Sequence, residues 1–178
     1  MLDHMTSATR QLILVRHAKA ADPGAQIDHD RALTDRGHAD AKALGEWFKE
    51  HRLRPDLVLC STSVRTRETW ADVVASSGLG ALVANDQRIY NASVDRLIDV
   101  IEDEGPPSRS IALVGHAPGV PGLAATLTEG VEPDPDAPSL DDGWPTCTAA
   151  VLEISVPWKD LAPGTGRLIS LHTARASE

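Results

Sequence analysis

The sequence contains few cysteines and few basic residues, and each shortage excludes a class of protein. Its 178 residues include only two cysteines, Cys60 and Cys147, which are too few for a disulfide framework and lie in no Cys-x-x-Cys pattern typical of zinc. The 17 Lys and Arg residues are outnumbered by 26 Asp and Glu residues, and the net charge of -9 disfavours binding to nucleic acid or to an anionic membrane. An anion-binding site in this chain therefore requires a local cluster of cations.

Long apolar runs are also absent from the chain. Residues 1–10 are polar and lack the apolar core of a signal peptide, and no later run approaches the roughly 18 apolar residues of a membrane span. Together with the few cysteines, this predicts a cytoplasmic protein. We expect residues 1–10 to be an N-terminal tail, in which residues 1–4 could be added by cloning and Met5 could be the start. Residues 11–178 are expected to form a single domain and, by default, a monomer.

Short apolar runs alternate with segments of helical spacing, which predicts a layered α/β fold. After their first residues, Gln11 and Ser110, the runs 11–15 and 110–114 are entirely apolar, so both are predicted to be strands buried on two faces of a mostly parallel sheet. Further strands are predicted at residues 57–60, 82–84, 149–156 and 167–173, the last two paired and in mixed orientation. Helices are predicted between them, beginning at the capping residues Thr34 or Asp35, Ser61 to Ser63 and Ser93, with a short fourth helix at residues 120–127. Residues 132–144 are predicted to be a surface loop.

Cationic residues and histidines follow three of the predicted strands. Arg16 and His17 come directly after the first strand, Arg65 comes shortly after the second, and His116 follows the strand at residues 110–114. Because ligands of an open α/β sheet collect beyond the carboxyl ends of its strands, these residues can converge. A guanidinium group matches phosphate oxygens, and a neutral imidazole can attack phosphorus. Each residue alone is more often a solvated loop residue, but their joint placement predicts a phosphate site.

The order of these motifs resembles a known family. Leu14-Val-Arg16-His17-Ala18-Lys19 is similar to the Arg-His-Gly/Ala signature of the histidine phosphatase superfamily, also called the phosphoglycerate mutase-like superfamily. Later blocks of that family match in the expected order: Leu33-Thr34 with Gly37, Ser61-x-x-x-Arg65-Thr66 with Glu68-Thr69, and Gly115-His116. The opening, residues 28–34 and the short length most resemble the small SixA-like phosphohistidine phosphatases.

The resemblance implies a three-layer α/β/α sandwich and a phosphatase that needs no metal or other cofactor. In such an enzyme His17 would become phosphorylated, Arg16 and Arg65 would neutralise the phosphoryl oxygens, and His116 would donate a hydrogen bond in the transition state. Water would then hydrolyse phospho-His17. Arg31 is a further candidate for the phosphate pocket, with a surface ion pair as the alternative. The implied partner is a protein carrying phosphohistidine or a small phosphorylated metabolite.

The sequence departs from the family at two places. The second histidine is commonly followed by Asn-Pro-Gly, whereas Ala117 stands in the place of the asparagine here and loses a side-chain hydrogen bond. The carboxylate that serves larger members as a general acid is not recognisable. Asp22, Asp28, Asp30 and Asp86 are possible donors, but a surface carboxylate is ionised near neutral pH and donates no proton. We therefore expect all four to be solvated loop residues.

Three functions stay open from the sequence. A phosphohistidine phosphatase needs less help from a protein acid than an enzyme that cleaves alkyl phosphates, because imidazole is a better leaving group than an alkoxide. A phosphomonoesterase or mutase acting on sugar or nucleotide phosphates would need an acid that the sequence does not locate. A catalytically silent module would bind phosphate without turnover. Lys19 is expected at the rim of the site or in solvent, and structural or solvated roles are expected for the other histidines, His4, His29, His38, His51 and His172.

Overall fold

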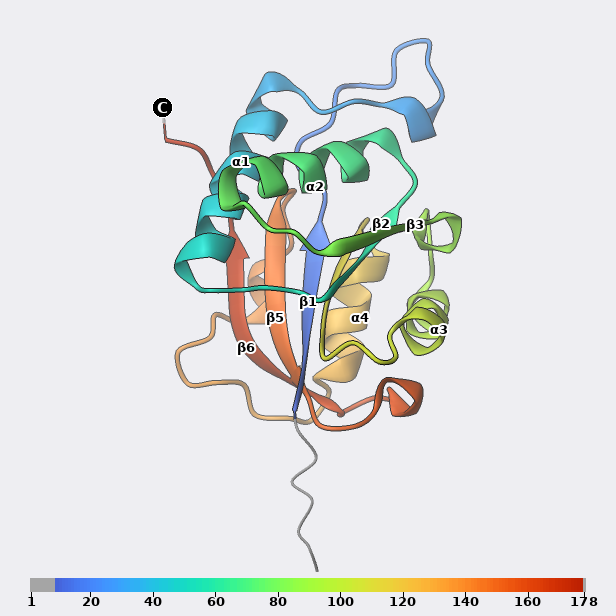
Figure 1. Ribbon diagram of the computed structural model, residues 1–178, viewed down its shortest axis with the longest axis vertical. Helices are drawn as coiled ribbons and strands as arrows, with labels where there is room; N and C mark the ends of the chain where they lie inside the picture. Colours follow the sequence, from blue (N-terminus) through green and yellow to red (C-terminus); the bar gives the residue numbers. More distant parts are fainter. Residues whose placement is uncertain (1–8, 178) are drawn as a thin grey trace, which may run out of the picture.

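The computed structural model describes residues 9–177, which contain one six-stranded sheet between two layers of helices (Figure 1). The strands are β1 (Arg10–Arg16), β2 (Leu57–Ser61), β3 (Leu82–Asp86), β4 (Ser110–Gly115), β5 (Thr148–Ile154) and β6 (Gly166–Thr173), in the spatial order β3-β2-β4-β1-β5-β6. Strands β1 to β4 run parallel, and β5 runs antiparallel to both β1 and β6. The predicted mostly parallel sheet with a mixed edge is confirmed. Residues 1–8, with most of the expected tail and His4, lie outside the described residues.

The helices cover both faces of the sheet and complete the predicted α/β/α sandwich. Helices α1 (Asp35–Glu50) and α2 (Val64–Ser77) pack with Ile13 and Val15 of β1, whereas α3 (Val94–Glu104) and α4 (Gly119–Leu127) pack with Leu12 and Leu14. Successive side chains of a strand point to opposite faces, so a strand that is covered on both faces has no polar alternation. None of the helices in residues 9–177 is long and apolar enough to cross a membrane.

Side-chain caps fix where the first three helices begin. The hydroxyl groups of Thr34, Ser63 and Ser93 accept hydrogen bonds from the backbone N–H groups three residues later. Such caps satisfy amide groups that have no partner within the helix. Thr34 rather than Asp35 caps α1, and Ser63 is the cap among the three residues predicted for α2. Helix α2 therefore starts directly beyond the carboxyl end of β2, with Arg65 in its first turn.

The connection between α4 and β5 is the predicted surface loop at residues 132–144. It contains a single short 3-10 turn, Leu140–Asp142, within otherwise irregular backbone. Because β5 runs antiparallel to β1, the loop must return to the carboxyl end of β1 before β5 begins. This return brings the carbonyl oxygen of Trp144 to 2.6 Å from Nη1 of Arg16.

Candidate active site

Three neighbouring parallel strands bring the predicted site residues to one edge of the sheet. In the order β2-β4-β1, the residue Arg16 lies opposite Gly115, and the backbone N–H of His17 donates to the Gly115 carbonyl at 3.1 Å. A cavity of about 310 Å³ opens at this edge, and Arg16, His17, Arg65 and His116 all line it. The four residues predicted from strand ends are therefore brought together although His17 and His116 lie far apart in the chain.

His17 is held as a neutral imidazole with a defined tautomer. Its Nδ1 atom lies 2.7 Å from the carbonyl oxygen of Ala18, which can only accept a hydrogen bond, so Nδ1 carries the proton and Nε2 carries the lone pair. Burial lowers the pKa of His17 to about 4, and the charges of Arg65 and Arg16 act in the same direction. A neutral imidazole with an unprotonated Nε2 is the form that can attack phosphorus.

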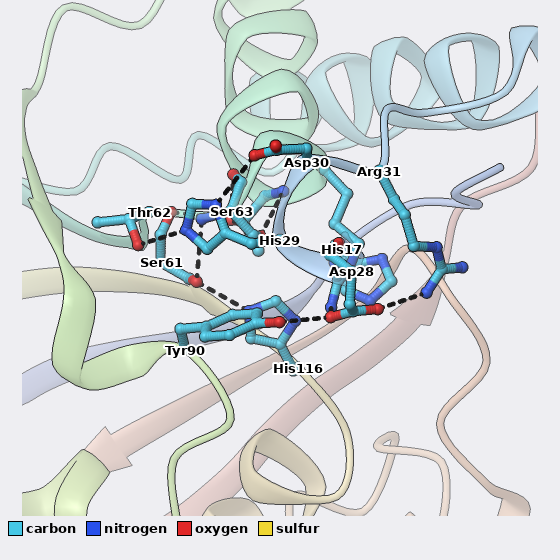
Figure 2. A network of polar contacts seen from close by, with 12 residues as sticks. His17, Asp28, His29, Asp30, Arg31, Ser61, Thr62, Ser63, Tyr90 and His116 are labelled. Carbon is cyan, nitrogen blue, oxygen red and sulfur yellow. Dashed lines mark hydrogen bonds and ion pairs between the residues drawn. The ribbon is translucent and has the colours of Figure 1, made fainter. Parts of the chain in front are cut away.

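His116 lies beside His17, with 5.4 Å between the ring centroids (Figure 2). Its Nε2 atom is 2.8 Å from Oγ of Ser61, and the same oxygen accepts the backbone N–H of Ser63 at 3.4 Å. The Ser61 hydroxyl can donate to Nε2, and in that arrangement the ring proton of His116 is on Nδ1. Burial, followed by the proximity of His17, lowers the pKa of His116 to about 3. The ring is neutral, and in this tautomer its Nδ1–H is a donor.

The two arginines are anchored by their terminal nitrogens. Nη1 of Arg16 donates to the carbonyl oxygen of Trp144 at 2.6 Å. Nη1 of Arg65 donates to the carbonyl oxygen of Asp28 at 2.8 Å, and its Nη2 donates to Oδ2 of the same residue at 3.0 Å. Burial lowers the pKa of Arg16, yet a guanidinium stays charged in proteins. Both arginines are therefore fixed cations.

Three buried N–H groups of the site have no partner within the described part of the chain. They are Nε of Arg16, Nε of Arg65 and Nδ1 of His116, and the one further buried side-chain atom without a partner is Nε1 of Trp70 in the core. Buried polar groups are normally paired, so three such donors at one cavity need an explanation. A phosphoryl group supplies strong oxygen acceptors for charge-assisted hydrogen bonds. These donors can hold a phosphoryl group beside Nε2 of His17.

Two residues of α2 brace the loop that carries His17. The hydroxyl of Thr69 accepts the backbone N–H of Ala18 at 3.0 Å, and Oε2 of Glu68 accepts the backbone N–H of Leu33 at 2.7 Å. Both Glu68 and Thr69 belong to the motif blocks that resemble the family. Their side chains fix the backbone next to His17 and at Leu33.

Arg31 and Lys19 both line the cavity. Nε of Arg31 donates to the carbonyl oxygen of Ala21 at 2.8 Å, and its Nη1 donates to Oδ1 of Asp28 at 2.9 Å. Arg31 thus combines the two alternatives left open by the sequence, since it makes an ion pair and also faces the cavity. Lys19 is exposed at the rim. Ala117 is exposed there too, where an asparagine would add a polar group.

Asp28 is exposed, as expected, but its carboxylate is paired rather than surrounded by solvent alone. Its Oδ2 accepts hydrogen bonds from Arg65 and, at 2.6 Å, from the hydroxyl of Tyr90, while Oδ1 accepts from Arg31 (Figure 2). The hydrogen bond from Tyr90, followed by those from Arg31 and Arg65, holds the pKa of Asp28 well below its ordinary value. Asp28 is therefore ionised and cannot serve as a proton donor. Asp86 also departs from the expectation of a solvated carboxylate, because its side chain is only 16% exposed and pairs with Arg88 at 2.8 Å.

Histidines outside the cavity make local contacts. His29 lies 2.9 Å from Oγ1 of Thr62 through Nε2, and His38 lies 2.6 Å from Oδ2 of Asp72 through Nδ1. Within residues 9–177, no group of three or more His, Cys, Asp or Glu side chains could hold a metal ion.

Comparison with known proteins points to one family. The sequence pattern of the histidine phosphatase superfamily (branch 1) matches residues 12–90. An uncharacterized protein of Mycobacterium tuberculosis is 34% identical over 162 residues, which cover 90% of this chain and 100% of that protein. The structure of a SixA protein from Nakamurella multipartitia is 30% identical, with a TM-score of 0.81, and the match covers 95% of this chain and 98% of that one. A SixA protein from Agrobacterium tumefaciens is 28% identical, with a TM-score of 0.72 and coverage of 92% and 97%.

These likenesses extend over nearly the whole chain, and the fold and the order of the motifs agree with them. The chain therefore belongs to the histidine phosphatase superfamily, where it is SixA-like, and it is a phosphatase.

Proposed function

We propose that this phosphatase hydrolyses phosphohistidine, without a metal ion, through a phosphohistidine intermediate on His17. The observation that carries the proposal is a set of three buried N–H donors, from Arg16, Arg65 and His116, that have no partner in residues 9–177 and line the same cavity as a neutral His17. Fixed donors that are directed at developing negative charge stabilise a phosphoryl-transfer transition state, because they need no reorganisation during the reaction.

In the first step, Nε2 of His17 attacks phosphorus and the phosphorus–nitrogen bond of the substrate breaks. The leaving imidazole takes up a proton from water. The N–H groups of Arg16, Arg65 and His116 hold the phosphoryl oxygens during the transfer. In the second step, water attacks the phosphorus of phospho-His17, the bond to Nε2 breaks, and inorganic phosphate leaves while the water proton is released. His17 thereby regains its lone pair.

The lining of the cavity favours phosphohistidine over an alkyl phosphate. Among the described residues, the side chains that line it include no aspartate or glutamate. Protonating an alkoxide leaving group needs a positioned acid, and the nearby carboxylate of Asp28 is ionised. An imidazole leaving group needs less help from a protein acid, and in this proposal water supplies its proton. The name of the Nakamurella protein, phosphohistidine phosphatase SixA, supports the same substrate class.

The substrate imidazole belongs, in this proposal, to a phosphorylated protein or to a small phosphorylated metabolite. We further propose that the enzyme works in the cytoplasm as a monomer. The two cysteines Cys60 and Cys147 are free and buried, which suits a reducing compartment.

Phosphate release from three substrates tests the proposal. The protein and its His17→Ala variant are incubated with phosphohistidine, with a protein that carries phosphohistidine and with an aryl phosphate, first without added metal and then with a chelator. A His51→Ala variant is the matched control, because His51 lies at the end of α1, where its Nδ1 contacts the Trp47 carbonyl oxygen at 3.0 Å, and it does not line the cavity. Release that survives chelation and is lost only in His17→Ala supports the proposal.

The other outcomes identify the alternatives. Hydrolysis of simple alkyl phosphates as fast as phosphohistidine would indicate a phosphomonoesterase. Transfer of phosphate to a second molecule, rather than to water, would indicate a mutase. Absence of release from every substrate, with phosphate affinity retained in His17→Ala, would indicate a silent binding module.

A further inference from the structure

The terminal nitrogens of Arg65 are paired, whereas its Nε atom has no partner among the described residues. Nη1 and Nη2 are both taken by Asp28, through its carbonyl oxygen at 2.8 Å and its Oδ2 at 3.0 Å. Nε is buried and has no partner among the described residues, although Arg65 lines the cavity. One residue on a loop thus binds one edge of the guanidinium and leaves the Nε–H unpaired.

We infer that Asp28 is a positioning residue that fixes the plane of the Arg65 guanidinium so that Nε–H is presented to a phosphoryl oxygen. The inference rests on the proposed function and adds to it a residue that touches neither the substrate nor His17. Two hydrogen bonds from one partner define the orientation of a planar group, whereas a single contact would leave it free to rotate.

Asp28 is itself held in place by two further side chains. Tyr90 donates its hydroxyl to Oδ2 at 2.6 Å, and Arg31 donates Nη1 to Oδ1 at 2.9 Å. Both carboxylate oxygens are therefore occupied, and Figure 2 shows Asp28 between Tyr90 and Arg31 in front of His17. The Tyr90 ring also lies 5.9 Å below Cζ of Arg65. The short turn Asp28–Asp30 is thus tied to two distant parts of the chain, at Arg65 and Tyr90, and to the adjacent Arg31.

The same contact has a second interpretation, in which Asp28 competes with phosphate. The Asp28 carboxylate would then neutralise the charge of Arg65 and block its contact with phosphate. Removal of this carboxylate would strengthen anion binding. The division of donors favours positioning, because the nitrogen left without a partner, Nε, is not one of those that bind Asp28. The two interpretations predict opposite signs for the same substitution.

Asp30 provides a matched control on the same turn. Its carboxylate is exposed and its contact is with His29 at 3.5 Å, with no contact to Arg65. Removing either charge reduces the negative potential near the cavity by the same formal amount. A difference between variants of Asp28 and Asp30 therefore reports the contact with Arg65 and not the general field.

The experiment compares the wild type with Asp28→Ala, Asp28→Asn and Asp30→Asn. Affinity for orthovanadate, which imitates the transition state of phosphoryl transfer, is measured by calorimetry, and kcat and KM are measured with phosphohistidine. We expect Asp28→Ala to weaken vanadate binding and to lower kcat by about 10- to 100-fold, because a small misplacement of a catalytic group has effects of that size. KM should change by no more than a few-fold, since the misplaced donor acts mainly in the transition state. Asp30→Asn should match the wild type.

Tighter vanadate binding in Asp28→Ala would overturn positioning in favour of competition, and equal behaviour of the Asp28 and Asp30 variants would overturn it as well. If Asp28→Ala fails to fold, Asp28→Asn and Tyr90→Phe decide the question. Tyr90→Phe removes the hydroxyl that holds Oδ2 and should lower kcat in the same direction by a smaller factor. A wild type that neither binds vanadate nor releases phosphate would instead refute the proposed function, whereas an active wild type with an equally active Asp28→Ala refutes only the role of Asp28.

Discussion

Oγ of Ser61 lies 2.8 Å from Nε2 of His116, so the Ser61 hydroxyl can donate to Nε2 and favour the tautomer with the ring proton on Nδ1. Replacing Ser61 with Ala removes the group that selects this tautomer. We expect kcat to fall by about 10-fold or more, because the donor to the transition state would be present in only part of the molecules. The ¹⁵N chemical shifts of the His116 ring, which differ between the tautomers, should change together with kcat.

Ser110→Ala is the control for this variant. Ser110 begins the same strand, β4, and its hydroxyl donates to Oε1 of Gln11 at 3.0 Å, away from the cavity. This variant should keep both the kcat and the His116 spectrum of the wild type. A Ser61→Ala enzyme with an unchanged spectrum would contradict the assigned tautomer.

Arg16 and Lys19 separate the effect of geometry from that of charge. Arg16→Lys keeps the positive charge but loses the Nη1 bond to Trp144 and the buried Nε–H donor. Lys19→Gln removes a charge from an exposed rim position, where solvent screens it. We expect Arg16→Lys to lower kcat by roughly 100-fold, as for the loss of a fixed donor, and Lys19→Gln to change it by less than about 3-fold. Steady-state kinetics with phosphohistidine measure both effects. A larger loss of kcat in Lys19→Gln than in Arg16→Lys would show that net charge, rather than geometry, dominates.

Two buried neutral histidines make the free energy of unfolding depend on pH. Burial lowers the pKa of His17 to about 4 and that of His116 to about 3, from an ordinary value of 6.5. As the pH falls below 6.5, the unfolded chain binds protons that the folded protein does not, so the free energy of unfolding decreases down to the folded pKa values. Well above pH 6.5 these histidines are neutral in both the folded and the unfolded protein, so they no longer make the free energy of unfolding depend on pH. For His17 the shift corresponds to on the order of 3 kcal/mol.

Urea denaturation at several pH values between about 5 and 7 measures this dependence. The double variant His17→Asn, His116→Asn removes both groups and should show a shallower decrease on acidification. An equal slope in the two proteins would mean that other groups cause the pH dependence and that these histidines are not held neutral by the fold.

The strands and the four residues at their ends could be predicted because they depend on short segments of sequence. Uninterrupted apolar runs mark strands covered on both faces, and Arg16, His17 and His116 follow such runs directly. A parallel sheet then brings strand ends to one edge regardless of their separation in the chain. The position of Arg65 follows from the helix cap at Ser63.

The side chains that orient the site could not be predicted in this way. Asp28 and Arg65 are 37 residues apart, and Asp28 and Tyr90 are 62 apart, so no local spacing relates them. Their contact depends on how an irregular loop folds over the sheet, and loop conformation has no periodic signal in the sequence. The segment from Asp28 to Arg31 is part of the family resemblance, but the resemblance does not say what Asp28 does. The structure shows that Asp28 binds both terminal nitrogens of Arg65.

Close packing of α1 against α2 makes Gly45 sensitive to substitution. A Cβ atom at Gly45 would lie 2.5 Å from the carbonyl oxygen of Val73 and would also overlap Oγ of Ser76. Glycine to alanine within a helix normally stabilises by about 1 kcal/mol, but this overlap should reverse the sign and destabilise Gly45→Ala by about 1–3 kcal/mol. Gly80→Ala, where no atom lies within 4 Å of the new Cβ, is the control and should change stability little. Urea denaturation of both variants measures the difference, and a stabilised Gly45→Ala would contradict the packing.

The central claim, that His17 carries the phosphoryl group, is tested most directly by trapping the intermediate. The enzyme is mixed with a ³²P-labelled phosphohistidine protein, quenched in alkaline denaturant within one turnover, and digested for mass spectrometry. The account predicts a label that is stable in alkali, labile in acid and located on Nε2 of His17, and absent in His17→Ala. A label on another residue, or hydrolysis at the wild-type rate in His17→Ala, would contradict it.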